Sequence, residues 1–195
     1  MNKGTLVIFA LLLFSSCSPT SSENTTDGNP YSIDTQLIEQ IYLQQFGLEN
    51  KKIANVPLTS ETNEIKSWSE IVKNGSIMVF FISEISCFDC VVKQIRYIAA
   101  YLSNNNKLPI VLISSSESIR SVYSVLVKYG LELPIYTTKY KDLGFERELH
   151  PGPLFFIIGD KLTTRFYYEP LINNELITRN YLSRAKEIYF SHNNY

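Results

Sequence analysis

The chain has 195 residues, with 18 Lys and Arg against 19 Asp and Glu, so its formal net charge is −1. Nucleic-acid binding depends on a clustered basic face, and the nearly equal numbers of positive and negative residues do not indicate such a face. No nucleic-acid partner is therefore expected. Its length and its 45% hydrophobic residues suffice for one well-packed domain.

The first 16 residues have the pattern of a secretory signal. Lys3 precedes an unbroken apolar stretch, residues 5–14, which is too short to cross a bilayer as a helix. Two small residues then lead to Cys17, and this ending is similar to the signal of a bacterial lipoprotein. The resemblance implies that residues 1–16 are removed and that Cys17 is acylated with fatty acids such as palmitate. Signal cleavage without lipidation is the alternative.

A polar segment follows the predicted lipidation site. Residues 17–30 contain no large apolar side chain, so they cannot bury surface and are predicted to form a flexible tether. We therefore expect one folded domain over residues 31–195, held to a membrane of the cell envelope by the lipid, on its periplasmic face. Acylation of Cys17 would leave Cys87 and Cys90 as the thiols of the mature protein.

The first half of the domain contains two helical patterns and two β-prone segments. Apolar residues at helical spacing predict a helix over residues 32–46. Residues 51–64 are β-prone but interrupted by Pro57, which favours a short hairpin or an edge strand. A short capped helix is expected over residues 67–75. The continuous apolar run at residues 77–82 then predicts a buried strand.

Two cysteines open the helical pattern that follows this strand, in the segment Cys87-Phe-Asp-Cys90. A cysteine at a helix N-terminus faces unpaired backbone N–H groups and the positive end of the helix dipole, and both favour the thiolate. A second cysteine one turn later can resolve a mixed disulfide. The spacing therefore predicts a thiol–disulfide redox site. The apolar face of this helix is predicted to contain Val91, Ile95, Ile98 and Leu102.

The rest of the chain alternates between strand and helix patterns. Alternation of this kind predicts an α/β domain with a mostly parallel sheet, and a closing hairpin adds an antiparallel edge. The predicted elements are a strand at 110–113, a helix from 116 to Gly130, a strand at 134–137, a short helix or loop at 139–148, a hairpin of 154–158 with 162–168, and a final helix at 174–190.

This order of elements resembles a thioredoxin-like domain of the TlpA/redoxin type. The resemblance implies a central mixed sheet flanked by helices, with residues 116–137 as the helix–strand insertion of that family. It also implies that Cys87 is the attacking thiol and Cys90 the resolving thiol, and that no cofactor is needed. Pro153 takes the place of the family's cis-proline, which would leave the backbone of Gly152 free to bind an extended substrate.

Several positions depart from the family pattern. Ser86 stands where the family usually has Trp, and Phe81 stands where thioredoxins keep a buried carboxylate, with Glu84 as a substitute base. Ile95 replaces a helix proline. Asp89 places a negative charge between the cysteines, which is expected to disfavour the Cys87 thiolate and to favour a reductase or isomerase over a strong oxidase.

The sequence thus favours an enzyme, an envelope thiol–disulfide oxidoreductase that reduces or isomerises the disulfides of a client protein. Its electrons would come from a membrane or envelope partner. The alternative is a binding module of the same fold. Its cysteines would form an inert structural disulfide, or would bind Cu(I) together with His150 as two sulfur ligands and one nitrogen ligand.

Two further activities fit the residues less well. A peroxiredoxin-type peroxidase needs Pro and Thr or Ser seven and three residues before its reactive cysteine, where this chain has Phe80 and Glu84. A structural zinc site needs a second ligand pair to match the CxxC, which the sequence lacks. No resident metal is therefore expected.

Overall fold

The computed structural model describes residues 50–84, 86–104, 107–115, 119–139, 143, 152–170 and 174–191. All of them belong to one compact unit, Asp34–Tyr195. The predicted signal, Cys17, the tether and the helix at 32–46 lie outside the described residues. So do His150 and most of the predicted loop at 139–148.

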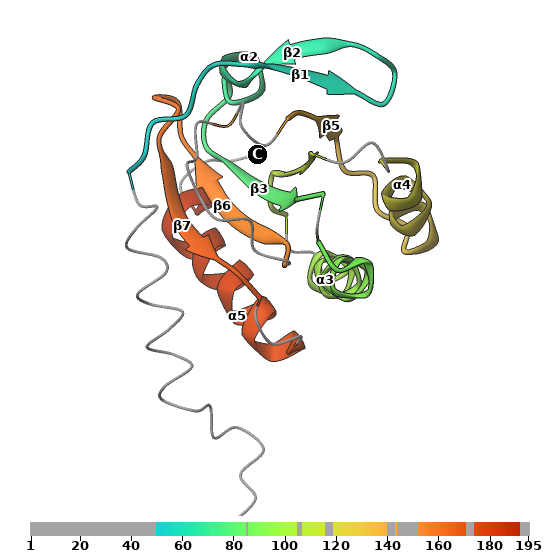
Figure 1. The fold of residues 1–195 in the computed structure, drawn as a ribbon. Helices are drawn as coiled ribbons and strands as arrows, with labels where there is room; N and C mark the ends of the chain where they lie inside the picture. The colour runs from blue at the N-terminus through green and yellow to red at the C-terminus, as the bar shows by residue number, and fades with distance from the viewer. Residues whose placement is uncertain are drawn as a thin grey trace, which may run out of the picture. The chain divides into compact units, whose positions relative to one another are not determined.

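The described residues form seven strands, which belong to a single sheet. They are β1 (Pro57–Ser60), β2 (Ile65–Ser67), β3 (Ile77–Ile82), β4 (Ile110–Ser114), β5 (Ile135–Thr137), β6 (Leu154–Ile158) and β7 (Thr164–Tyr168). Their order across the sheet is β2-β1-β5-β4-β3-β6-β7 (Figure 1). The three central strands β3, β4 and β5 are parallel, whereas β6 and β7 form an antiparallel hairpin beside β3. The predicted mixed sheet is confirmed.

Helices cover both faces of this sheet. They are α2 (Trp68–Ile71), α3 (Phe88–Leu102), α4 (Ile119–Lys128) and α5 (Glu175–Ala185), which continues as a π-helical turn, Lys186–Phe190. The helix-side core, on one face of the sheet, contains side chains of α3, α4 and α5, whereas Trp68 of α2 packs into a second core on the other face. In the described part of the chain, no helix is both long and apolar enough to cross a membrane.

Strand β3 lies at the centre of the sheet because both of its faces are apolar. Met78 and Phe80 point into the core beneath α3, whereas Val79 and Phe81 point into the core on the side of α2. All four side chains are at most 3% exposed. A strand buried on both faces reads as an unbroken apolar run, which is why its bounds were predictable.

The ends of two helices follow their sequence signals. At the start of α2, Ser67 donates from its backbone N–H and its hydroxyl to Glu70, at 2.7 and 2.6 Å. At the end of α4, Gly130 adopts a positive φ of 65°, and the Leu131 N–H donates to the Leu126 carbonyl at 3.0 Å. This is the helix ending that glycine favours, as predicted.

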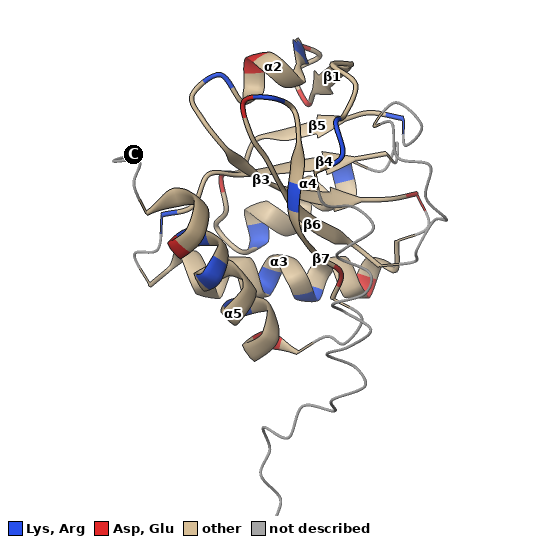
Figure 2. Cartoon of the chain, turned by 90° about the vertical axis from the view of Figure 1, so that its left-hand side faces the viewer, with Lys and Arg blue, Asp and Glu red and all other residues tan. Residues whose placement is uncertain are grey.

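Several boundaries differ from the prediction. The helix expected over residues 67–75 ends at Ile71. The first hairpin spans residues 57–67 instead of 51–64, because Pro57 begins strand β1 instead of interrupting it. Proline is tolerated as the first residue of a strand, where its missing N–H removes no ladder hydrogen bond. Figure 2 shows positive and negative residues interspersed over the described helices and loops, in keeping with the near-zero net charge.

Candidate functional site

The two cysteines lie where the central strand passes into the first long helix. Cys87 is the N-cap residue of α3, and Cys90 lies in the first turn. The Cys90 backbone N–H donates to the Cys87 sulfur at a distance of 3.4 Å between nitrogen and sulfur. Cys87 is exposed, whereas Cys90 is partly buried, and neither forms a disulfide. An outer and an inner thiol thus share one helix N-terminus.

The surroundings of Cys87 favour its thiolate. The pKa of Cys87 lies below its ordinary value of 9.0, first because the Cys90 thiol donates a hydrogen bond to its sulfur and second because the Cys90 backbone N–H does so. The charge of Asp89 acts in the opposite direction, as the sequence analysis expected, but it is the smaller effect. The expected direction of the Asp89 effect is confirmed, and the thiolate stabilisation expected at the helix N-terminus outweighs it.

We predict that alkylation of Cys87 by iodoacetamide follows a pH midpoint below that of an ordinary cysteine. Because the Asp89 charge opposes the thiolate, Asp89→Asn should raise the alkylation rate at pH 7 about twofold, the effect of one exposed charge. Cys90→Ala removes the thiol donor and should lower that rate. Peptide mass spectrometry on the full chain reports Cys87 separately from the other cysteines.

The matched control for this prediction is Asp160→Asn, since Asp160 is an exposed acid in the β6–β7 turn at the opposite end of the sheet. It should leave the alkylation rate of Cys87 unchanged. A midpoint at or above the ordinary cysteine value would contradict the effect assigned to Cys90.

Ser86 connects the cysteine turn to a distant segment. Its hydroxyl oxygen accepts from the Ser83 N–H at 3.0 Å and lies 2.9 Å from the Ser83 hydroxyl oxygen. The same hydroxyl donates to the Gly152 carbonyl at 3.4 Å. The family pattern marks Ser86 only as a missing Trp and does not predict this contact. The Ser-x-x-Ser spacing, typical of a turn closed by a hydroxyl, was the available signal.

Gly152 and Pro153 lie beside the cysteine turn. Pro153 is buried, and the next residue, Leu154, pairs with Phe81 near the end of β3. The described residues contain no cis peptide bond, so Gly152 is joined to Pro153 in the trans form. Trans is the more stable isomer of such a bond, and the expectation of a cis-proline here is wrong. The Gly152 carbonyl is engaged by Ser86, whereas the described residues provide no partner for its N–H.

The acidic residues near the site do not take the place of the buried carboxylate that thioredoxins keep at the position of Phe81. Glu84 is exposed in the turn after β3, and Phe81 is buried in the core. Among the residues that the structure describes, the buried acid is Glu169, which directly follows β7 and is only 6% exposed. A Cβ atom on Gly152 would lie 3.4 Å from its Oε1. The burial of Glu169 is not predictable from the sequence, because an acid after a hairpin strand is typical of a solvated loop.

A buried hydrogen-bond network fixes the cysteine helix to the rest of the domain. Gln94, one turn after Cys90, accepts from the Thr178 hydroxyl at 2.9 Å, and that hydroxyl lies 3.2 Å from the Tyr168 hydroxyl. The three residues belong to α3, α5 and β7. Burial raises the pKa of Tyr168 to about 12, so its hydroxyl stays protonated. The network joins α3, α5 and β7 through buried side chains.

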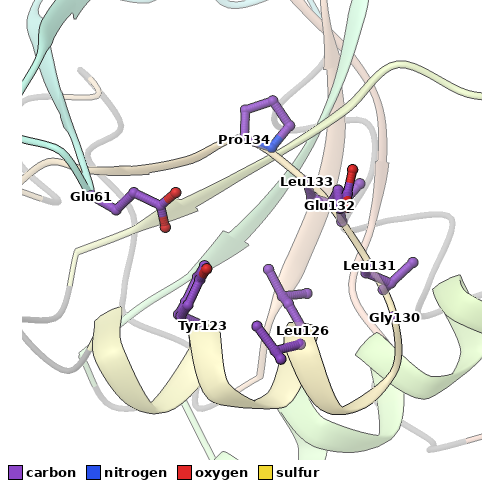
Figure 3. Close-up of a pocket in the computed structure, with 9 residues that line it drawn as sticks. Glu61, Tyr123, Leu126, Gly130, Leu131, Glu132, Leu133 and Pro134 are labelled. Carbon is purple, nitrogen blue, oxygen red and sulfur yellow. The ribbon is translucent and has the colours of Figure 1, made fainter.

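The hollow in Figure 3 is separate from the cysteines. It has a volume of about 530 Å³ and lies beside α4, lined by Glu61, Tyr123, Leu126, Val127 and residues 130–134. Neither cysteine lines it. No group of three His, Cys, Asp or Glu residues in the described ranges could hold a metal ion. The Cu(I) alternative needs His150, which lies outside those ranges, so it stays untested.

Comparisons with known proteins bear on the fold. No protein-family model matches the chain, and no curated protein matches it by sequence. A peroxidoxin from Mycobacterium tuberculosis, BcpB, matches in structure with a TM-score of 0.51 and 12% identity, over 72% of this chain and 97% of that chain. A PrxQ mutant from Xylella fastidiosa matches with a TM-score of 0.50 and 14% identity, over 71% and 95%.

A candidate protein disulfide isomerase from Bacteroides thetaiotaomicron also matches. Its TM-score is 0.51 at 14% identity, over 73% of this chain and 89% of that chain. At such identities the likeness shows the fold alone. The mixed sheet, the helices on its two faces and these matches agree with the predicted architecture. The chain therefore has a thioredoxin-like fold, with its two cysteines at the start of the helix that follows the central strand β3.

Proposed function

We propose that the protein is a thiol–disulfide oxidoreductase whose redox centre is the Cys87–Cys90 pair. The observation that carries the proposal is the placement of an exposed cysteine at the N-cap of α3, with its sulfur accepting hydrogen bonds from Cys90 and its pKa lowered. A lowered thiol pKa at a helix N-terminus is the usual setting of a reactive cysteine. A structural disulfide has no need of a stabilised thiolate.

The chemistry proceeds in two exchanges. The Cys87 thiolate attacks one sulfur of a client disulfide, forming a mixed disulfide and releasing the other client sulfur as a thiolate, which takes up a proton. Cys90, after losing its proton to solvent, attacks the Cys87 sulfur and releases the second client thiolate. Two electrons pass to the client, and the protein ends with a Cys87–Cys90 disulfide. A second dithiol protein must reduce it again.

Two opposed effects at Cys87 bear on the direction of exchange in the cell, and the Cys87 pKa alone does not fix that direction. The charge of Asp89 disfavours the thiolate and favours reduction or isomerisation of client disulfides, whereas the Cys90 hydrogen bonds favour the thiolate and a more oxidising pair. We propose the reductive or isomerising direction, with a lipid anchor at Cys17 holding the domain at an envelope membrane beside its electron donor. The reduction potential is the quantity that decides it.

The proposal is tested by the reduction potential of the pair in the full chain. Titration in glutathione or dithiothreitol buffers, followed by thiol alkylation, should give a reversible couple between about −270 and −180 mV, the span from thioredoxin to disulfide isomerase. The Cys17→Ser variant should give the same value. A pair that stays oxidised below about −300 mV, or that exchanges with no disulfide, would instead indicate a redox-inert binding module.

A peroxidase activity has weaker support, although a peroxidoxin shares the fold. The positions that would carry the Pro and the Thr or Ser of a peroxiredoxin site are Phe80, fully buried in the helix-side core, and Glu84, exposed in the turn. Neither can supply the hydroxyl donor of such a site. We therefore place disulfide exchange ahead of peroxide reduction.

A further inference from the structure

The hollow beside α4 has the size and the lining of a site for a small organic molecule (Figure 3). Its volume of about 530 Å³ falls in the range of roughly 300–1,000 Å³ that is usual for such sites. Two large side chains of α4 that line it are left exposed, Tyr123 at 48% and Val127 at 59%. Disulfide exchange at the cysteines makes no use of this hollow.

The lining of the hollow carries negative charge. Glu61 extends from the β1–β2 turn toward α4, and Glu132 comes from the segment between α4 and β5. The described residues that line the hollow include no Lys or Arg, and Arg120 lines an adjoining hollow instead. Within the described ranges, neither carboxylate forms an ion pair. Both are therefore available to a positively charged ligand.

Helix α4 adds two further features that favour a cation. The helix ends at Lys128, and Gly130 and Leu131, which follow its end, line the hollow. The C-terminal end of a helix carries partial negative charge on its last carbonyl groups. The Lys128 ammonium lies 5.8 Å from the centre of the Tyr129 ring, and Lys128 does not line the hollow. Tyr123 supplies an aromatic ring, whose face attracts cations.

The rest of the lining is apolar. It consists of side chains from α4 and from the segment that leads into β5: Leu126, Val127, Leu131, Leu133 and Pro134. An apolar body of a ligand gains free energy by covering such a surface, in proportion to the area removed from water. A simple inorganic cation would leave this surface exposed, whereas an organic cation would cover it.

We propose that this hollow binds an organic cation with an apolar body, such as an arylalkyl ammonium ion. The carboxylates of Glu61 and Glu132 attract its positive group, the Tyr123 ring adds a cation–π contact, and the apolar body covers the exposed Val127. An anion of the same shape is repelled. The site is independent of the proposed disulfide exchange, because neither cysteine lines the hollow.

The test uses three probes that share one apolar body and differ in charge: phenylbutylammonium, phenylbutanol and phenylbutanoate. Each is titrated into the isotopically labelled full chain, and the NMR shifts of the Gly130, Leu131 and Glu132 amides are followed. The ammonium ion should bind with a roughly millimolar Kd, as expected for a ligand of its size. It should bind about threefold more tightly than the alcohol and about tenfold more tightly than the carboxylate, in keeping with weak, exposed charge pairs.

Variants of the lining separate charge from apolar contact. Glu61→Gln and Glu132→Gln should each weaken binding of the ammonium ion about twofold, and the double variant should remove its preference over the alcohol. Binding of the alcohol should change less than about twofold in all three. Tyr123→Leu keeps an apolar lining without the ring, so it should weaken the ammonium ion more than the alcohol.

The matched control is Glu175→Gln, since Glu175 is an exposed acid at the start of α5 and does not line the hollow. It should leave the affinities of all three probes unchanged. Equal affinities for the three probes would overturn the proposal, as would saturable shifts confined to amides outside the hollow. The absence of any saturable shift with the ammonium ion would also overturn it, and would leave the proposed disulfide exchange standing.

Discussion

Cys87→Ser is expected to lose disulfide exchange entirely, whereas Cys90→Ser should stop after the first step. Only a thiolate sulfur attacks a disulfide, so a serine at position 87 should lower the rate by on the order of 10³-fold, to background. In Cys90→Ser, the exposed Cys87 still attacks, but no second thiol resolves the intermediate. Non-reducing gel electrophoresis with a disulfide-bonded client should show a trapped mixed disulfide in this variant alone.

The control for this pair of variants is Cys17→Ser, since Cys17 is the third cysteine of the chain. Its exchange rate should equal that of the wild type, and the trapped species should be unchanged when it is combined with Cys90→Ser. Equal trapping by Cys87→Ser and Cys90→Ser would contradict the assignment of Cys87 as the attacking thiol. That assignment rests on Cys87 being the exposed sulfur at the N-cap and Cys90 the partly buried one.

Sequence patterns predicted the parts of the fold that local chemistry determines. β3 was predictable because burial on both faces leaves an unbroken apolar run, and the end of α4 because Gly130 adopts a positive φ. The cysteines were placed at a helix start because a polar turn separates them from β3. Pro57 was misjudged because the same residue can interrupt a strand or begin one, and only its pairing with Ser67 distinguishes the two.

The parts of the site that sequence missed depend on contacts between distant residues. Ser86 and Gly152 are 66 positions apart, and their hydrogen bond depends on how β6 pairs with β3. Glu169 becomes buried only because the β6–β7 hairpin brings its end to the cysteine edge. The Asp89 charge was visible in the sequence. The stronger hydrogen bonds from Cys90 were not, because they depend on how the first turn of α3 presents its donors to the Cys87 sulfur.

The largest expected loss of stability follows from Phe155→Ala in β6. The Phe155 ring is fully buried and stacks on Phe80 of β3 with ring centroids 4.6 Å apart. It also lies 5.8 Å from the Tyr168 ring and 5.7 Å from the Tyr181 ring, so it joins β3, β7 and α5 in one core. Truncation of such a phenylalanine should lower the free energy of unfolding by about 3–5 kcal/mol, from lost burial and the remaining cavity. That is a large share of the roughly 5–15 kcal/mol that stabilises an ordinary domain.

Urea unfolding of the full chain, followed by circular dichroism, measures this loss. The matched control is Phe88→Ala, because the Phe88 side chain is 50% exposed at the start of α3 and should contribute less than about 0.5 kcal/mol. A loss below about 1 kcal/mol in Phe155→Ala would contradict the close packing of the helix-side core. Because the same core supports the helix that begins at the cysteines, Phe155→Ala should also reduce disulfide exchange at urea concentrations that leave the wild type folded.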